Sequence, residues 1–199
     1  MKFFQEITLL PGVDIDINFL WQKAFKFLHL ALVGLKNSED LIPVGISFPE
    51  YEEKDKKLGT KIRLFAPNQE ILAELDISNK LKSLSDYLHI TSIRNVPTGL
   101  VKQHALFSRW RSIANPERLA RRRAKRHGVS LEQAMEHFKD YKTDISSAPP
   151  YIATKSLSNN NDFRLYISMK KVSEPSTGLF SCYGLSTSER TPPATVPLF

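Results

Sequence analysis

Hydrophobic and polar residues form strand-like patterns at four places in the first half of the chain. Residues 60–65 alternate with a period of two, residues 3–10 form a strand-like run closed by Pro11-Gly12, and residues 44–48 form a short apolar run closed by a proline. Residues 89–93 form a fourth, more polar segment of the same kind. Such patterns are typical of short, partly buried strands, so four strands are predicted over these ranges.

Between these strands, hydrophobic residues recur at helical spacing. Residues 16–35 are predicted to form a helix, capped by Asp16, from the apolar positions Leu20, Ala24, Phe27, Leu28, Ala31 and Leu35. After Pro67-Asn68 a second helix is predicted from Ile71, Leu72 and Leu75, and a further helical set comprises Leu81, Leu84 and Leu88. The order βαββαβ predicts a ferredoxin-like domain, with helices on one face of an antiparallel sheet.

The second half of the chain has a different organisation. Residues 94–114 show no regular period and are interpreted as an irregular connector. Asn115 and Pro116 favour a helix start and Gly128 a helix end, so a helix is predicted over 116–127. A second helix is predicted from the capping box Ser130–Gln133 and the apolar stripe Leu131, Ala134, Met135, Phe138 and Tyr141.

Strands over 151–158 and 163–169 and a last element over 178–186 complete the pattern. The predicted fold class is therefore α+β. A ferredoxin-like domain over residues 1–95 is followed by an α+β domain over residues 96–199 that carries an arginine-rich helix and C-terminal strands.

Composition narrows the class of protein. A chain of 199 residues can bury a core without disulfides or a structural metal. Its one cysteine, Cys182, excludes an internal disulfide framework and fits a reducing compartment. No signal peptide and no apolar stretch of membrane-spanning length is visible, so a cytoplasmic protein without membrane contact is expected.

The positive charge is concentrated in one helix. Residues 115–128 contain six Lys or Arg and one acid, Glu117, in a chain of net charge +7. Arg118, Arg122, Lys125 and Arg126 share one helical face, and acids that would pair with them four residues away are missing. A solvated face is the alternative, but unbalanced arginine favours nucleic-acid phosphates, and the lack of DNA-binding motifs favours RNA.

Few residues in the sequence form a pattern typical of a catalytic or metal-binding site. Asp14-Ile15-Asp16 precedes a helix and is interpreted as a cap, so neither a metal site nor another cofactor is expected. A metal-free ribonuclease needs a base for the 2′-hydroxyl, and histidine titrates near neutral pH. His29 lies on an apolar helix and, from pattern alone, fits a core-edge residue better than a catalyst. His104 is the reserve candidate.

Several separated motifs together resemble one family, the CRISPR-associated endoribonuclease that processes precursor crRNA in type I-F systems. They are FLHLALV (27–33), VGISFP (44–49), NPERLARRRAKRH (115–127), a Lys-Ser-x-Ser strand followed by FRLYI (163–167), and FSCYGLS (180–186). They follow the family's order along nearly the whole chain. The combination of FSCYGLS with the arginine helix is the most specific part of the resemblance.

The resemblance implies a substrate and a set of roles. The substrate is the RNA hairpin of the CRISPR repeat, cut without metal at the 3′ base of its stem by 2′-hydroxyl attack, with the product retained. His29 corresponds to the catalytic histidine, Tyr183 to the tyrosine that supports it, and Ser156 to the serine that holds the 2′-hydroxyl, with Ser158 as the alternative. Phe163 would stack beneath the terminal base pair. Other subunits of a type I-F surveillance complex are implied partners.

The resemblance also assigns the RNA contacts, which are Arg109, Arg111, Arg118, Arg121, Arg122, Lys125, Arg126 and Phe163. Lys125 replaces an arginine of the family, which keeps the charge but loses the bidentate fork. Arg111 stands where the family has glutamine, so it either reads guanine or contacts phosphate. Two other functions stay open: a catalytically silent hairpin-binding subunit of a ribonucleoprotein, and a general basic RNA-binding protein.

Overall fold

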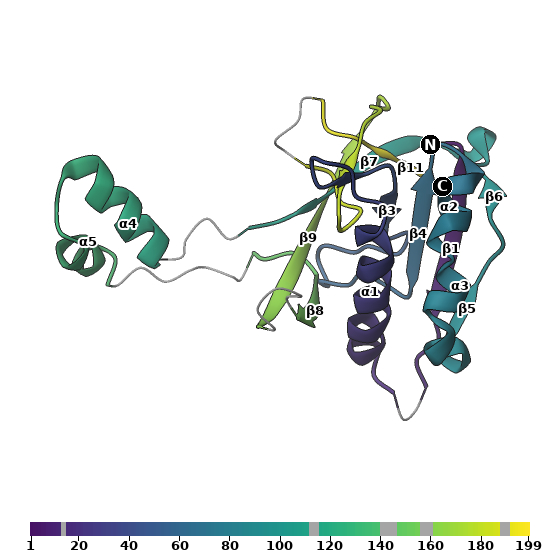
Figure 1. Cartoon of the computed structure of the whole chain (residues 1–199), viewed down its shortest axis with the longest axis horizontal. Coiled ribbons are helices and arrows are strands. Elements are labelled where there is room, and N and C mark those ends of the chain that lie inside the picture. The colour runs from purple at the N-terminus through teal and green to yellow at the C-terminus, as the bar shows by residue number, and fades with distance from the viewer. Residues whose placement is uncertain (13–14, 112–115, 140–146, 156–160, 188–191) are drawn as a thin grey trace. The chain divides into compact units, whose positions relative to one another are not determined.

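The computed structural model describes residues 1–12, 15–111, 116–139, 147–155, 161–187 and 192–199. Contacts between Cα atoms divide the chain into two units (Figure 1). The first unit comprises residues 1–109 and 149–199, and the second comprises residues 110–148. Each unit is described separately below. The sequence-based domain boundary between residues 95 and 96 stays a prediction.

The first sheet of the first unit has the strand order of a ferredoxin-like fold. Its strands are β1 (Phe3–Leu9), β3 (Gly45–Ser47), β4 (Lys61–Ala66) and β5 (Leu88–Ile90), with β6 (Arg94–Asn95) on the far half of β1. They pair antiparallel in the order β3-β4-β1-β5. The first and third strands along the chain are thus central, as a split βαβ pattern requires. The expected α+β class and the four predicted strands are confirmed.

Helix α1 (Ile17–Val33) forms where the periodicity predicts it. The Asp16 side chain accepts a hydrogen bond from the Asn18 N–H at 2.8 Å and so caps the first turn. Its buried residues are Leu20, Trp21, Ala24, Phe25, Leu28 and Leu32. They join Ile7 and Ile62 of the sheet in one hydrophobic core. The helix is therefore anchored along its length by apolar burial.

The second predicted helical region differs from its expected form. α2 (Gln69–Leu75) is capped by Asn68, as expected, but residues 81–88 do not form one α-helix. A short α3 (Ile77–Lys80) is followed by a 3₁₀ helix over Lys82–Tyr87. Asp76 adopts a left-handed conformation, with φ of 45°, between α2 and α3. This residue ends α2. Leu81 is buried at the end of α3, Leu84 is partly buried in the 3₁₀ helix, and Leu88 is buried at the start of β5.

A second antiparallel sheet completes the first unit and corrects the prediction of an irregular connector. Its strands are β7 (Gln103–Arg109), β8 (Tyr151–Lys155), β9 (Asp162–Val172) and β11 (Val196–Leu198), in the order β11-β7-β9-β8. Residues 103–109 are therefore a central strand. Ala105 and Phe107 are buried on one of its faces, in the same core as the first sheet. The alternation is hard to recognise in the sequence because it is short and is flanked by the exposed basic residues Lys102, Arg109 and Arg111.

The second unit is a pair of helices, α4 (Pro116–His127) and α5 (Leu131–His137), confirming both predicted helices. Gly128 has φ of 65°, which suits a residue just past a helix end. The capping box of Ser130 and Gln133 is present. Ala120 and Ala134 are buried, whereas Leu131 and Met135 of the expected apolar stripe are exposed. Asn115 and Tyr141 lie outside the described residues. Among the described helices, none is long and apolar enough to cross a membrane.

Candidate active site

His29 lies on α1 against the turn that follows the short strand β10 (Phe180–Ser181). Its Nδ1 is 3.0 Å from the carbonyl oxygen of Cys182. Its ring stacks on that of Tyr183, with centroids 4.1 Å apart and planes inclined by 4°. Because a carbonyl oxygen only accepts, this hydrogen bond requires the proton on Nδ1. The neutral ring then carries its lone pair on Nε2, where it can accept a proton.

The surroundings of His29 lower its pKa below the ordinary value of 6.5. Burial is the largest cause, since it disfavours the charged imidazolium. The hydrogen bond to the Cys182 carbonyl acts in the opposite direction, and the positive charge of Lys36 adds to the lowering. The lowered pKa favours the neutral ring near pH 7, the state in which Nε2 can serve as a base.

A tight turn holds Tyr183 against α1. β10 pairs with β2 (Leu41–Ile42), and the Gly184 N–H donates to the Ser181 carbonyl at 2.8 Å. The Gly184 carbonyl accepts from the Ile46 N–H, also at 2.8 Å. Gly184 has φ of 71°, and a Cβ there would come within 2.4 Å of an Ile46 side-chain carbon. Glycine is thus required at this position, and the turn is fixed to β3.

Arg109 and Phe163 lie together at the ends of neighbouring strands in the same unit. The Arg109 guanidinium carbon is 5.4 Å from the centroid of the Phe163 ring, a cation–π distance. Burial raises the pKa of Tyr183, and the charge of Arg109 acts against that rise. The contacts are therefore two pairs of side chains, His29 with Tyr183 and Arg109 with Phe163. The residues of each pair come from distant parts of the sequence.

The serine expected to hold the ribose follows directly after strand β8 (Tyr151–Lys155) in the sequence. Ser156 and its alternative Ser158 both lie outside the described residues. The strand β8 ends at Lys155, which pairs with Asp162 of β9, and Thr154 pairs with Phe163. The choice between the two serines stays a prediction.

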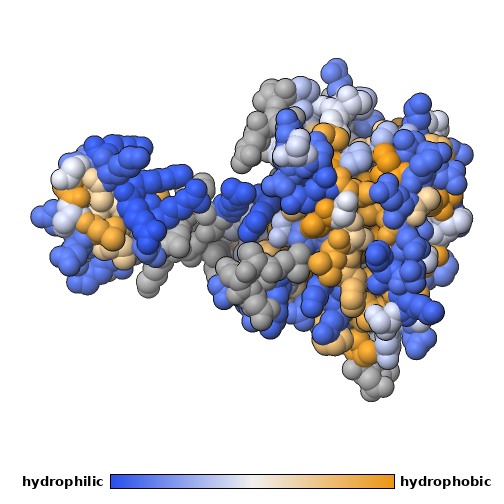
Figure 2. Space-filling view, viewed as in Figure 1, coloured by the Kyte–Doolittle hydropathy of each residue, from blue (hydrophilic) through white to orange (hydrophobic). Residues whose placement is uncertain are grey.

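The basic face of α4 is solvent-exposed, and much of the two-helix unit has a hydrophilic surface in Figure 2. Arg118, Arg121, Arg122, Lys125 and Arg126 are all exposed. Arg121 pairs with Glu117 at 2.5 Å, one turn away. Arg111 is exposed and precedes this helix in the same unit. The helix therefore presents a row of cations suited to a polyanion.

Lys36 and the carbonyl of Cys182 are the site features that the motif analysis missed. Lys36 lies just beyond α1 and pairs with Asp40 at 2.5 Å. A backbone carbonyl leaves no signature in a sequence, and only the spacing of seven residues from His29 hints at Lys36. The reserve candidate His104 lies on β7, with a buried Nδ1 that has no hydrogen-bond partner within the described residues. Among those residues, no three His, Cys, Asp or Glu side chains gather to hold a metal ion.

The comparisons with known proteins agree on one family. A family model described as "CRISPR-associated protein (Cas_Csy4)" matches residues 4–199. The chain belongs to the Cas_Csy4 family. This confirms the resemblance found in the motifs, and it does so over nearly the whole length of the chain.

Two relatives in the Cas_Csy4 family carry the name "CRISPR-associated endonuclease Cas6/Csy4". The one from Escherichia coli (strain UTI89 / UPEC) is 32% identical over 203 residues, which cover 100% of both chains. The one from Pseudomonas aeruginosa (strain UCBPP-PA14) is 30% identical over 187 residues, or 94% of this chain and 96% of its own. The similarity therefore includes the two-helix unit as well as the site around His29.

Proposed function

We propose that this Cas_Csy4 protein is an endoribonuclease that binds the hairpin of a CRISPR repeat and cuts precursor crRNA at the 3′ base of the stem. Membership of the family and the names of two relatives support CRISPR endonuclease activity. The observation that carries the mechanism is the orientation of the His29 imidazole, which is hydrogen-bonded through Nδ1 to the Cys182 carbonyl and stacked on Tyr183.

The proposed reaction is a transesterification that needs no metal. The 2′-oxygen of the nucleotide at the cut attacks the adjacent phosphorus while Nε2 of His29 takes its proton. The bond to the 5′-oxygen of the next nucleotide breaks, and that oxygen takes a proton from solvent water and leaves as a hydroxyl. The products are a 2′,3′-cyclic phosphate and a 5′-hydroxyl. Proton transfer to a positioned base increases the reaction rate by about 10²- to 10⁴-fold.

The other assigned residues have supporting roles in this proposal. Ser156 holds the 2′-hydroxyl, and Phe163 stacks beneath the last base pair with Arg109 beside it. The cations of α4, above all Arg122, Lys125 and Arg126, bind the phosphates of the stem. Since the stem stays intact after the cut, those contacts persist in the product and keep it bound. Retention of the product would let further subunits of a crRNA-guided complex assemble on it.

One cleavage assay tests the proposal. Purified protein is incubated with a repeat hairpin in excess EDTA, and with the same hairpin carrying 2′-deoxyribose at the cut. We expect cleavage of the first, with a cyclic phosphate on the upstream product, and binding without cleavage of the second. Reaction of the deoxy substrate, or a strict need for Mg²⁺, would exclude 2′-hydroxyl attack. Tight binding of both hairpins without any cleavage would instead identify a silent hairpin-binding subunit.

A further inference from the structure

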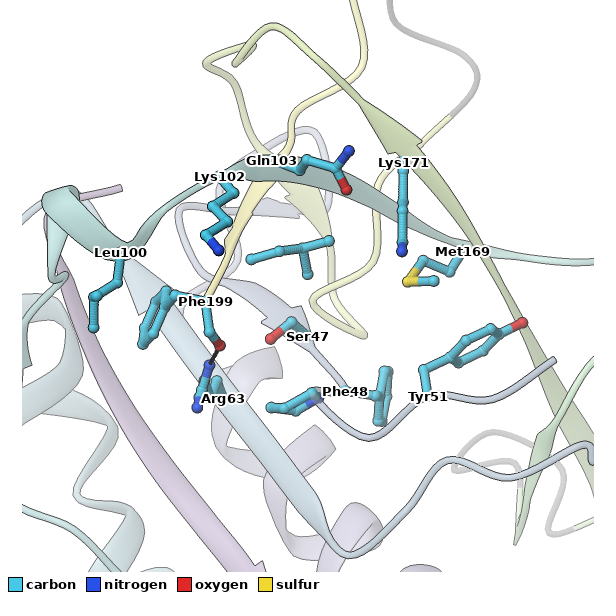
Figure 3. Close-up of a pocket in the computed structure, with 12 residues that line it drawn as sticks. Ser47, Phe48, Tyr51, Arg63, Leu100, Lys102, Gln103, Met169, Lys171 and Phe199 are labelled. Carbon is cyan, nitrogen blue, oxygen red and sulfur yellow. Dashed lines mark hydrogen bonds between the residues drawn. The ribbon is translucent and has the colours of Figure 1, made fainter.

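A second feature of the first unit is a pocket of about 510 Å³ between the two sheets, drawn in Figure 3. Its lining comes from the end of β3 and the residues after it, from β4, from the start of β7, from β9 and from Phe199. It shares no residue with the site around His29. The pocket is therefore separate from that site.

The pocket is apolar on its inner side. Phe48, Met169 and Phe199 line it, and Leu100 stands at its rim (Figure 3). Leu100 is 63% exposed, the highest value among the large exposed hydrophobic side chains of the described residues. An apolar pocket rimmed by polar side chains is the kind of surface that marks a binding site, and Leu100 extends its apolar surface to the rim.

The pocket also carries uncompensated positive charge. Lys102 and Lys171 are exposed, extend into the pocket in Figure 3, and form no ion pair within the described part of the chain. Arg63 is different, because its Nε donates to Glu6 at 2.6 Å and its Nη1 to the Phe199 oxygen at 2.5 Å. No acidic side chain occurs among the described lining residues. Two lysines are thus available for anionic groups of a ligand.

We propose that this pocket docks an acidic peptide segment of a partner protein. One large apolar side chain of the segment fills the cavity beside Met169 and Leu100, and flanking carboxylates pair with Lys102 and Lys171. Apolar burial supplies the affinity and the charges set orientation and selectivity. The inference rests on the pocket alone and does not depend on the proposed ribonuclease activity.

A single-stranded RNA is the main competitor for such a site, and the aromatic rings disfavour it. RNA binding without base pairing relies on open ring faces for stacking. Phe48 is only 1% exposed, and the Arg63 guanidinium already lies 4.3 Å from the centre of the Phe199 ring. The Tyr51 ring packs edge-on against Phe107. The exposed Leu100 would also gain little from a nucleotide.

The methionines of the chain offer a clean test, because there are only three: Met1, Met135 and Met169. Met169 lines the pocket, and Met135 lies on α5 in the arginine-rich unit. In protein labelled with ¹³C at the methionine methyls, each site therefore has its own signal. The probe is the peptide acetyl-Glu-Asp-Phe-Glu-Asp-amide. Controls are a version with serine for phenylalanine, a version with Gln and Asn for the acids, and pentauridylate RNA.

We expect the acidic peptide to shift the Met169 methyl signal saturably while Met1 and Met135 stay unchanged. Both control peptides should bind at least several-fold more weakly. Lys102→Ala and Lys171→Ala should each weaken binding roughly two- to five-fold, as expected for exposed ion pairs. The matched double variant Lys54→Ala/Lys80→Ala removes two exposed charges elsewhere and should leave the affinity unchanged.

Three outcomes would overturn the inference. A shift of Met135 without Met169 would show that the peptide binds the arginine helix through charge alone. Equal binding by the serine-containing peptide would exclude an apolar anchor. A saturable Met169 shift with pentauridylate, and none with the peptide, would assign the pocket to RNA.

A pair of leucine variants tests the contact at the rim of the pocket. Leu100→Ser should weaken peptide binding, whereas Leu10→Ser, at another exposed leucine, should leave it unchanged. Equal weakening in both variants would indicate a general effect of surface polarity.

Discussion

The site around His29 and the basic face of α4 differ in burial and in how firmly their side chains are held. His29 is half-buried, its Nδ1 is bonded to a backbone carbonyl, and its ring lies on Tyr183. The cations of α4 are exposed, and the ion pair of Arg121 with Glu117 is solvated. One region fixes a single proton acceptor in one orientation. The other presents a row of exposed cations, an arrangement that suits a polyanion.

The contrast implies that chemistry and affinity can be lost separately. A buried imidazole controls the rate of one step but contributes little to holding a long anion. Exposed cations contribute to holding the anion through counterion release, and they do so with or without a functional catalyst. Substitutions in the two regions should therefore give opposite patterns of rate and affinity.

The largest separation is expected from His29→Ala. Loss of the proton acceptor should lower the single-turnover rate of hairpin cleavage by about 10²- to 10⁴-fold, while the dissociation constant changes little. Rates are measured with enzyme in excess and affinities by titration of the deoxy hairpin. His89→Ala, at an exposed histidine on β5, is the control and should behave as the parent protein.

His104 provides the alternative outcome for that experiment. If His29→Ala cleaves at the parent rate and His104→Ala does not, the catalytic assignment moves to His104. The lowered pKa of His104, caused first by burial and then by the nearby N-terminal charge, would also make it neutral at pH 7. The geometry favours His29, because its ring is oriented by stacking on Tyr183 and by a hydrogen bond to the Cys182 carbonyl.

The opposite pattern is expected from Arg122→Ala/Lys125→Ala/Arg126→Ala. At about 0.1 M salt each lost phosphate contact should weaken binding by about 5- to 10-fold, and the slope of log affinity against log salt should fall by about one unit per residue. Cleavage of the saturated complex should keep its rate. Lys139→Ala, in the same unit but paired with Glu136, is the control. An unchanged salt slope in the triple variant would identify the face as merely solvated.

The same two regions differ in how far the sequence alone determines them. The α4 helix follows from local signals, Pro116 at its start and Gly128 past its end, and its exposed charges are evident from composition. α1 and β1 follow equally from their periodicity. β7 does not, because its short alternation is surrounded by basic residues, and only pairing with β9 and β11 makes it a central strand.

The site around His29 depends on long-range packing. From its apolar neighbours alone, His29 fits a core-edge residue, and only the family motifs point to catalysis. Its partner Cys182 is 153 residues away and contributes a backbone oxygen, so no pattern of side chains encodes the contact. Glycine is required at position 184 because the fold brings the Ile46 side chain close to it, and the sequence alone does not show this contact. Such features require the folded chain.

A smaller effect is expected at Tyr183, which tests whether the ring or the hydroxyl matters. Tyr183→Phe keeps the stack on His29, whereas Tyr183→Leu removes it. Since aromatic pairs contribute about 0.5–1.5 kcal/mol, the leucine variant should cleave roughly 2- to 12-fold more slowly and the phenylalanine variant near the parent rate. Hairpin affinity should be unchanged in both. A large loss in Tyr183→Phe alone would instead indicate that the hydroxyl takes part in the reaction.

The smallest effect is expected in the pH dependence of the cleavage rate. It tests how nearby charges set the pKa of His29. As a base, His29 must be neutral, so the cleavage rate should fall as pH drops through its pKa, which lies below 6.5. Lys36 helps to lower that pKa, so Lys36→Gln should raise it and move the acid limb to higher pH. Asp40→Asn removes the partner of Lys36, leaves its charge uncompensated, and should move the limb the other way.

The Asp40 variant is a fair match because Asp40 has φ of 60°, a conformation that asparagine also tolerates. Single-turnover rates are measured from pH 5 to 8 on saturated complexes, so changes in affinity do not enter. Opposite displacements of the acid limb in the two variants would establish that Lys36 acts on the titration of His29. Displacements of the same sign would mean that the substitutions act through the fold around α1, and an alkaline limb instead of an acid one would make His29 the proton donor of the rate-limiting step.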